Sequence, residues 1–142
     1  MYADYDFYKS TYGGTAFTTE ASYAKYAEMA ADFMDFATRL RITDNLPSSA
    51  SSLKAIKRCE CVIADLYKQI DDIKTNGTGI VSGGIVKSMS SGGESISIEP
   101  GSLQTAIAGG EVEIRKYLAD EAKIYLAGIT DDEGHYYYYW GI

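Results

Sequence analysis

The sequence is poor in the residues from which metal sites and disulfides are built. It has one histidine, His135, and two cysteines among its 142 residues. A single histidine cannot supply a multi-histidine zinc site. Cys59 and Cys61 stand two positions apart on a predicted helix, about 200° around its axis, which suits neither a disulfide nor a shared metal ion. We therefore expect two small buried side chains there and no metal or cofactor.

Long apolar runs are also missing. No stretch approaches the roughly 18 apolar residues that a membrane-spanning helix needs. The first residues, Met1–Asp4, are polar and acidic, unlike a secretory leader. The composition is nevertheless 46% hydrophobic and 23% charged, which is typical of a chain with a folded core. We expect one domain over residues 1–142, made in the cytoplasm and without membrane contact.

Basic residues are outnumbered, with 13 Lys and Arg against 20 Asp and Glu, for a net charge of -7. This balance argues against general affinity for nucleic acid, which depends on neutralising phosphates. The bases are concentrated between residues 39 and 58, where only Asp44 is acidic. This basic band has three interpretations: a DNA contact, a patch for a neighbouring subunit, or a solvated face. Its members are Arg39, Arg41, Lys54, Lys57 and Arg58.

Catalytic motifs are missing as well. The chain has no G-x-S-x-G elbow to place a nucleophile. The glycine-rich stretch 79–84 lacks the Gly-Lys-Ser/Thr of a phosphate loop. Two carboxylate groups, at residues 71–72 and 131–133, lack the alternating spacing of a calcium loop, and we interpret both as solvated charge. These absences predict a protein that is not an enzyme.

Helical periodicity covers most of the chain. Residues 4–12 carry aromatic side chains at near-helical spacing, and a glycine pair closes this segment. Thr18 or Thr19 can cap the next helix, whose apolar stripe runs from Tyr23 to Leu40.

Two further helices follow. The stronger apolar stripe runs from Leu53 to Ile73 and ends at Asn76-Gly77, and the last helix covers Glu111–Leu126. The opposite face of the stronger helix carries Lys54, Lys57, Arg58, Asp65 and Lys68. The sequence therefore predicts a mainly α fold, a small bundle of three to four helices formed by residues 1–76 and 102–129.

Residues 77–101 interrupt the helices with seven glycines and many serines. Pairing Val86–Ser91 with Glu94–Glu99 across Gly92-Gly93 predicts a β-hairpin with a two-residue turn. A lone hairpin is marginally stable in water, so we expect this insert to lie on the helical body or on another chain. Its predicted partner-binding residues, paired across the strands, are Met89 with Ile96 and Lys87 with Ile98.

The extended tail, residues 130–142, is strongly aromatic. Four consecutive tyrosines and the only tryptophan lie within its last seven residues. Such rings bury about 150–250 Å² each, and Tyr and Trp are enriched at interface hot spots. The tail either folds back on its own domain or docks on another chain. The predicted partner-binding residues are Tyr136, Tyr137, Tyr138, Tyr139 and Trp140.

Several short sequence motifs, in their order along the chain, are similar to those of a known protein family. The chain resembles the head–tail connector, or adaptor, family of long-tailed bacteriophages over most of its length. The motifs are Tyr5–Lys9, Tyr12–Thr15, Thr38–Ile42, Leu53–Glu60, Val86–Ile98, Tyr125–Ile129 and Tyr139–Ile142.

The resemblance implies a structural virion protein in the phage neck. Such adaptors form a twelve-membered ring under the portal protein, join it to stopper or tail-terminator proteins, and line the channel through which double-stranded DNA leaves without sequence-specific binding. The alternative function is an acidic helical protein-binding module that acts on a host protein.

Overall fold

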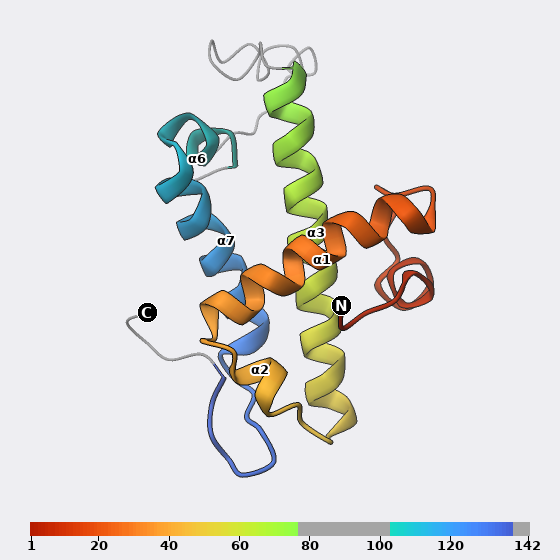
Figure 1. The fold of residues 1–142 in the computed structure, drawn as a ribbon, viewed down its shortest axis with the longest axis vertical. Helices are drawn as coiled ribbons and strands as arrows, with labels where there is room; N and C mark the ends of the chain where they lie inside the picture. The colour runs from red at the N-terminus through yellow and green to blue at the C-terminus, as the bar shows by residue number, and fades with distance from the viewer. Residues whose placement is uncertain (77–102, 138–142) are drawn as a thin grey trace. The chain divides into compact units, whose positions relative to one another are not determined.

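The computed structural model describes residues 1–76 and 103–137 (Figure 1). They belong to two compact units, and each unit is described by itself. Unit 1 contains Met1–Tyr67 and Ala119–Ile142, and unit 2 contains Lys68–Leu118. The helices in chain order are η1 (Phe7–Tyr12, a π-helix), α1 (Glu20–Ala37), α2 (Arg41–Asp44), α3 (Ala50–Asn76), α6 (Leu103–Gly109) and α7 (Glu111–Leu126).

The mainly α class predicted from the sequence is confirmed. Within the described ranges, β pairing is limited to one antiparallel bridge between Thr130 and Tyr136. The predicted hairpin, residues 77–101, lies outside the described residues, as do its four predicted partner-binding side chains. In the part of the chain that the structure describes, no helix combines the length and apolarity needed to cross a membrane.

The first long helix, α1, begins as the sequence predicts but ends earlier. Thr19 is its N-cap, and its hydroxyl oxygen accepts a hydrogen bond from the Ser22 N–H at 3.1 Å. The helix ends at Ala37, and Arg39 and Leu40 then adopt left-handed backbone angles, with φ of 57° and 66°. The prediction that Leu40 continues the buried stripe is therefore wrong: the turn leaves its side chain exposed.

Helix α3 supplies the core of unit 1 with Ile56, Cys59 and Ile63, all fully buried, and α1 crosses this part of it (Figure 1). Both cysteines are buried and free, which confirms the expectation of small core side chains. Because a buried thiolate is poorly solvated, burial raises the pKa of Cys61 to about 12.

The N-terminal segment completes unit 1 with a cluster of aromatic rings. The Tyr8 ring is fully buried, with its centroid 4.8 Å from that of Tyr23 and 5.4 Å from that of Phe17. After η1, Gly13 has a φ of 80° and turns the chain. Gly14 then packs on the Tyr8 ring so closely that an added Cβ would lie 2.1 Å from a ring carbon. The segment is therefore part of the core of unit 1.

Unit 2 is smaller and also helical. Its buried apolar side chains come from the end of α3, from α6 and from the first half of α7. Lys74 and Glu111 form an exposed ion pair at 3.6 Å within this unit. The core residues of unit 2 are Ile70, Leu103, Ala106, Ile114 and Leu118.

Candidate functional site

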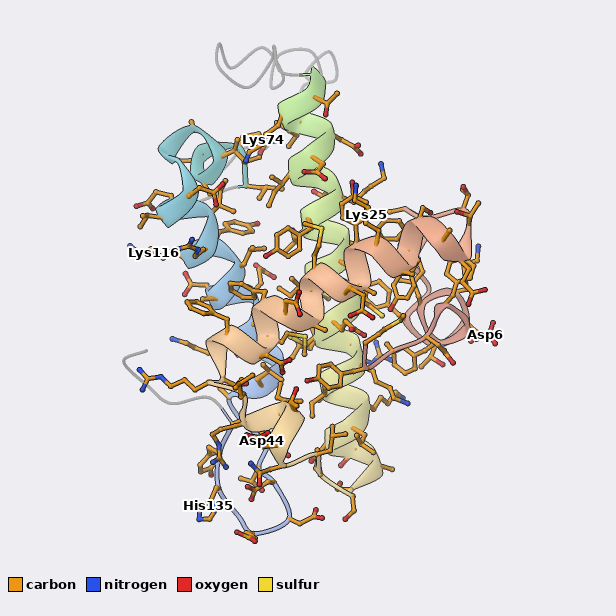
Figure 2. The ribbon with its side chains drawn as sticks, viewed as in Figure 1. Asp6, Lys25, Asp44, Lys74, Lys116 and His135 are labelled. Carbon is orange, nitrogen blue, oxygen red and sulfur yellow. The ribbon has the colours of Figure 1, made fainter. Side chains whose placement is uncertain are left out.

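The first residues of the aromatic tail are fixed to unit 1 by a compact set of contacts. After α7 the chain makes a loop, in which Figure 2 labels His135, and returns to pair Tyr136 with Thr130. Of the predicted tail residues, Tyr136 and Tyr137 are described by the structure, whereas Tyr138, Tyr139 and Trp140 lie outside the described residues.

Asp131 is the centre of this loop. Its carboxylate accepts hydrogen bonds from the backbone N–H groups of Glu133 and His135, both at 2.9 Å, and from Arg41 Nη2 at 2.9 Å. The hydrogen bond from the His135 N–H is the main cause that lowers the pKa of the Asp131 carboxyl. The prediction that residues 131–133 are only solvated charge is wrong for Asp131, because the side chain is buried and organises the turn.

Arg41, at the start of α2, connects two parts of this loop. Besides the ion pair with Asp131, its Nε donates to the Tyr136 carbonyl oxygen at 3.1 Å. Its guanidinium carbon also lies 5.9 Å from the centroid of the Tyr137 ring. Of the five residues in the basic band, Arg41 is therefore engaged within its own chain.

Tyr137 is fully buried, which shows that the tail folds back on its own domain at this residue. Its hydroxyl donates a short hydrogen bond to the carbonyl oxygen of Asn45, just after α2. Burial raises the pKa of this phenol to about 12. We call this set of residues the C-terminal latch. It consists of Arg41, Asn45, Asp131, the Tyr136 carbonyl and Tyr137.

A second polar contact supports the latch. Asp132 Oδ1 accepts hydrogen bonds from the backbone N–H of Ser48 at 2.9 Å and from its hydroxyl at 3.0 Å. Ser48 lies in the connection between α2 and α3. The loop after α7 is therefore attached to unit 1 at two successive carboxylates.

Exposed apolar side chains flank the latch residues along the chain. The Tyr136 side chain is 53% exposed although its backbone is bound by Arg41. Leu40 precedes Arg41, and Leu46 follows Asn45; both are at least half exposed. Large apolar side chains this exposed are typical of interaction surfaces when they gather in a patch. We call Leu40, Leu46 and Tyr136 the apolar rim.

Two carboxylates on α3, one buried and one half-buried, anchor the N-terminal segment. Glu60 is fully buried and accepts hydrogen bonds from the backbone N–H groups of Tyr2 at 2.9 Å and Ala3 at 2.5 Å. Asp65 accepts from the hydroxyls of Tyr8 at 2.8 Å and Tyr12 at 3.0 Å. The sequence predicts Asp65 on the face opposite the apolar stripe, and in the structure two tyrosines of the N-terminal segment contact it there.

Burial changes the acidity of both groups. It raises the pKa of the Glu60 carboxyl to about 7, against the opposing effect of the two backbone N–H donors. Burial is also the first cause that raises the pKa of Asp65. Neither carboxylate contacts a histidine or an arginine in any described hydrogen bond or ion pair. Their role in this structure is to bind the N-terminal segment.

The remaining basic residues lie in unit 1. Arg39 and Lys54 are exposed, whereas Lys57 and Arg58 are half-buried on α3. The Lys57 ammonium nitrogen lies 5.5 Å from the centroid of the Phe7 ring. Among the described residues, no group of three or more His, Cys, Asp or Glu side chains is placed to bind a metal ion.

Comparisons of this chain with protein-family models, curated proteins and solved structures gave no match. The candidate site therefore stands on the geometry of the latch and its rim. Physically, this arrangement fixes the position from which residues 138–142 continue, and it leaves Tyr136 accessible at that position.

Proposed function

We propose that this chain is a structural virion protein, an adaptor subunit in the neck of a long-tailed bacteriophage. In this role it joins the portal to the stopper or tail-terminator protein in a twelve-membered ring, and double-stranded DNA passes through the ring without sequence-specific binding. The order of the short sequence motifs supports the proposal. The observation that carries the proposal is the C-terminal latch, which attaches the first residues of the aromatic tail, Tyr136 and Tyr137, to the helical body.

The attachment of Tyr136 and Tyr137 to the helical body favours docking by the rest of the tail. A segment that binds a partner loses conformational freedom, at a cost of about 0.5–1.5 kcal/mol for each ordered side chain. Because Tyr137 and the Tyr136 backbone are already bound to the helical body, docking does not have to order them. Tyrosine and tryptophan contribute much of the binding energy at interfaces, and Tyr138, Tyr139 and Trp140 follow directly. The tail thus suits contact with the portal or a neighbouring subunit.

The charge distribution suits a ring of identical copies around DNA. A ring needs a heterologous interface, in which one patch meets a different patch on the next copy. Arg39, Lys54, Lys57 and Arg58 offer the basic patch of such a pair. The net charge of -7 suits a channel from which DNA must slide freely, because an acidic wall does not bind phosphates. The predicted hairpin, with Lys87, Met89, Ile96 and Ile98, is proposed to contact a neighbour or the next ring.

The direct test uses purified particles of the source phage. Mass spectrometry determines whether the chain is present, and a cryo-electron microscopy map of the neck shows whether it forms a ring between portal and tail. We expect about twelve copies for each particle and density for a helical ring at that level. Particles that lack the chain would reject the proposal.

A second candidate function is an acidic helical module that binds a host protein. The apolar rim favours it, since Leu40, Leu46 and Tyr136 are exposed on an acidic chain. It predicts a stoichiometric complex with one host protein in infected cells and no copies in particles. The same mass-spectrometric measurement on particles and on infected-cell extracts therefore separates the two functions.

A further inference from the structure

The outward side of α1 combines negative charge with an exposed aromatic ring. Glu28, Asp32 and Phe36 follow one another at intervals of four residues, which places them on one side of the helix about 6 Å apart. All three are exposed, and Phe36 is 67% exposed. We call these three residues the acidic stripe. It continues along the chain into the left-handed turn at Arg39-Leu40.

A turn ends α1 just beyond the acidic stripe. Arg39 and Leu40 are two successive non-glycine residues in left-handed conformation, as is common where a helix ends. The geometry is fixed by backbone hydrogen bonds from Leu40 to Asp35 at 2.7 Å and from Arg41 to Thr38 at 3.1 Å. The result is an exposed leucine just beyond the acidic stripe.

The N-terminal part of α3 carries a matching set of positive charges. Lys54 and Arg58 are four residues apart, the same interval as Glu28 and Asp32, and Lys57 lies beside them. We call these three residues the basic face. Among the described residues, none of the three forms an ion pair with a carboxylate, and Asp32 has no cationic partner there either. The described contact of Glu28 is the Met1 amino group at 3.6 Å.

We infer that the acidic stripe of one copy docks on the basic face of a second copy of this chain. The inference rests on the proposed ring, since it names the two patches of its heterologous interface. Pairing either patch with itself would bring like charges together, which opposes docking. Each patch therefore selects the other, and the equal four-residue spacing lets two ion pairs form at once. Phe36 adds apolar area beside them.

A contact between two different patches leaves one copy with a free basic face and the other with a free acidic stripe. Further copies can therefore add in the same way, and the series closes into a ring when the rotation allows it. The interface has a polar character, so its strength should fall as salt increases, with the Debye length shortening from about 30 Å at 0.01 M to 3 Å at 1 M.

Zero-length cross-linking tests the contact directly. A carbodiimide joins lysine to carboxylate only when the two groups touch. Equal amounts of unlabelled and ¹⁵N-labelled full-length chain are mixed at low salt, so that peptides joining two copies carry both labels. We expect mixed-label cross-links of Lys54 or Lys57 to Glu28 or Asp32, and their loss at high salt. Inter-copy cross-links confined to other pairs, or none, would overturn the inference.

Charge reversal provides the second test. Lys54→Glu/Arg58→Glu makes both patches acidic, and Glu28→Lys/Asp32→Lys makes both basic. Each variant alone should show at least about tenfold less self-association by sedimentation or native mass spectrometry. An equimolar mixture should restore association, because every interface then joins opposite charges. Restoration by mixing is the result that a general loss of folding could not give.

Matched controls carry the same changes of net charge elsewhere. Glu113→Lys/Asp120→Lys and Arg115→Glu/Lys116→Glu alter exposed positions of α7 and should associate like the wild type. Reversed variants that also associate like the wild type would overturn the inference. This failure is distinct from failure of the proposed function. If the chain is found in the neck but its reversed variants still assemble, the proposed function stands and this interface is rejected. If the chain self-associates through these patches but is absent from particles, the interface stands and the proposed function is rejected.

Discussion

Arg41 and Asp131 form an ion pair at 2.9 Å between positions 90 residues apart in the sequence. The carboxylate is nearly inaccessible to solvent, and its remaining acceptor capacity is used by the loop's own N–H groups. The guanidinium, through its Nε, also binds the Tyr136 carbonyl. A planar group with several fixed donors can serve both acceptors at once. This pair is therefore the point at which the loop after α7 is connected to α2.

Replacement of Arg41 should release the loop without unfolding the helices. Arg41→Lys keeps the charge, but a single ammonium group cannot reproduce the donors to both Asp131 and Tyr136. We expect faster amide hydrogen exchange over residues 131–137 and unchanged exchange in α1. Arg39→Lys, at an exposed position two residues away, is the control. Equal protection of the loop in the wild type and in Arg41→Lys would contradict the latch.

The buried ring of Tyr137 should be the largest single contribution of the tail to stability. Tyr137→Ala should lower the free energy of unfolding by about 3–5 kcal/mol, because it removes a fully buried aromatic side chain. Tyr137→Phe should cost about 1 kcal/mol, because only the hydrogen bond to Asn45 is lost. Tyr136→Ala is the matched control and should stay within about 0.5 kcal/mol of the wild type. Urea unfolding followed by circular dichroism measures all three.

The helices were predictable because their signals are local. The cap at Thr19 and the end of the second long helix at Asn76 follow from residues a few positions apart, as does the last helix over Glu111–Leu126. The end of α1 was not predictable in the same way. An apolar leucine at position 40 continues a helical pattern. Its side chain is exposed because the helix has already ended and Arg39 and Leu40 form a left-handed turn.

The candidate site was predictable in composition but not in geometry. The aromatic composition of the tail predicts an interaction segment. It does not predict that the Tyr137 side chain is buried and the Tyr136 side chain is exposed. The partners of Asp131 and Asp65 lie 90 and 57 residues away, so no local pattern distinguishes these carboxylates from solvated ones. Long-range hydrogen bonds of this kind depend on the packed structure, which charge patterns along the chain do not encode.

Glu60 should make stability depend on pH. Its pKa is about 7 in the folded chain, against an ordinary value of 4.5. The folded state therefore binds the proton more tightly, and stability should fall as pH rises from about 4.5 to about 7, by up to about 3 kcal/mol for this shift. Glu60→Gln cannot ionise, so its unfolding midpoint should change less over this interval. Glu20→Gln, at an exposed carboxylate, should keep the wild-type profile.

Gly14 should tolerate no side chain. A Cβ there would overlap the ring of the buried Tyr8, so Gly14→Ala must displace the ring or the backbone. We expect a loss of about 1–3 kcal/mol, typical of overpacking. Gly128→Ala is the control, since nothing lies within 4 Å of its added Cβ and its φ is not positive. A thermal melt in which both variants match the wild type would contradict the tight contact between Gly14 and Tyr8.

Two truncations should separate the tail's part in folding from its part in attachment. Deletion of residues 138–142 leaves every described contact of the latch in place, so we expect near-wild-type stability. Deletion of residues 135–142 also removes Tyr137 and the His135 N–H that binds Asp131, so the free energy of unfolding should fall by about 3–5 kcal/mol.

Both truncated chains should fail to join particles if residues 138–142 contact the portal or a neighbouring subunit. The measurement is the amount of chain in particles purified from a phage whose only copy is the truncated one, with the wild type grown in parallel. The shorter deletion is the decisive one because it removes none of the described latch contacts. If that variant enters particles at wild-type levels and supports infection, the aromatic tail is not the attachment segment, and the apolar rim at Leu40, Leu46 and Tyr136 becomes the surface to mutate next.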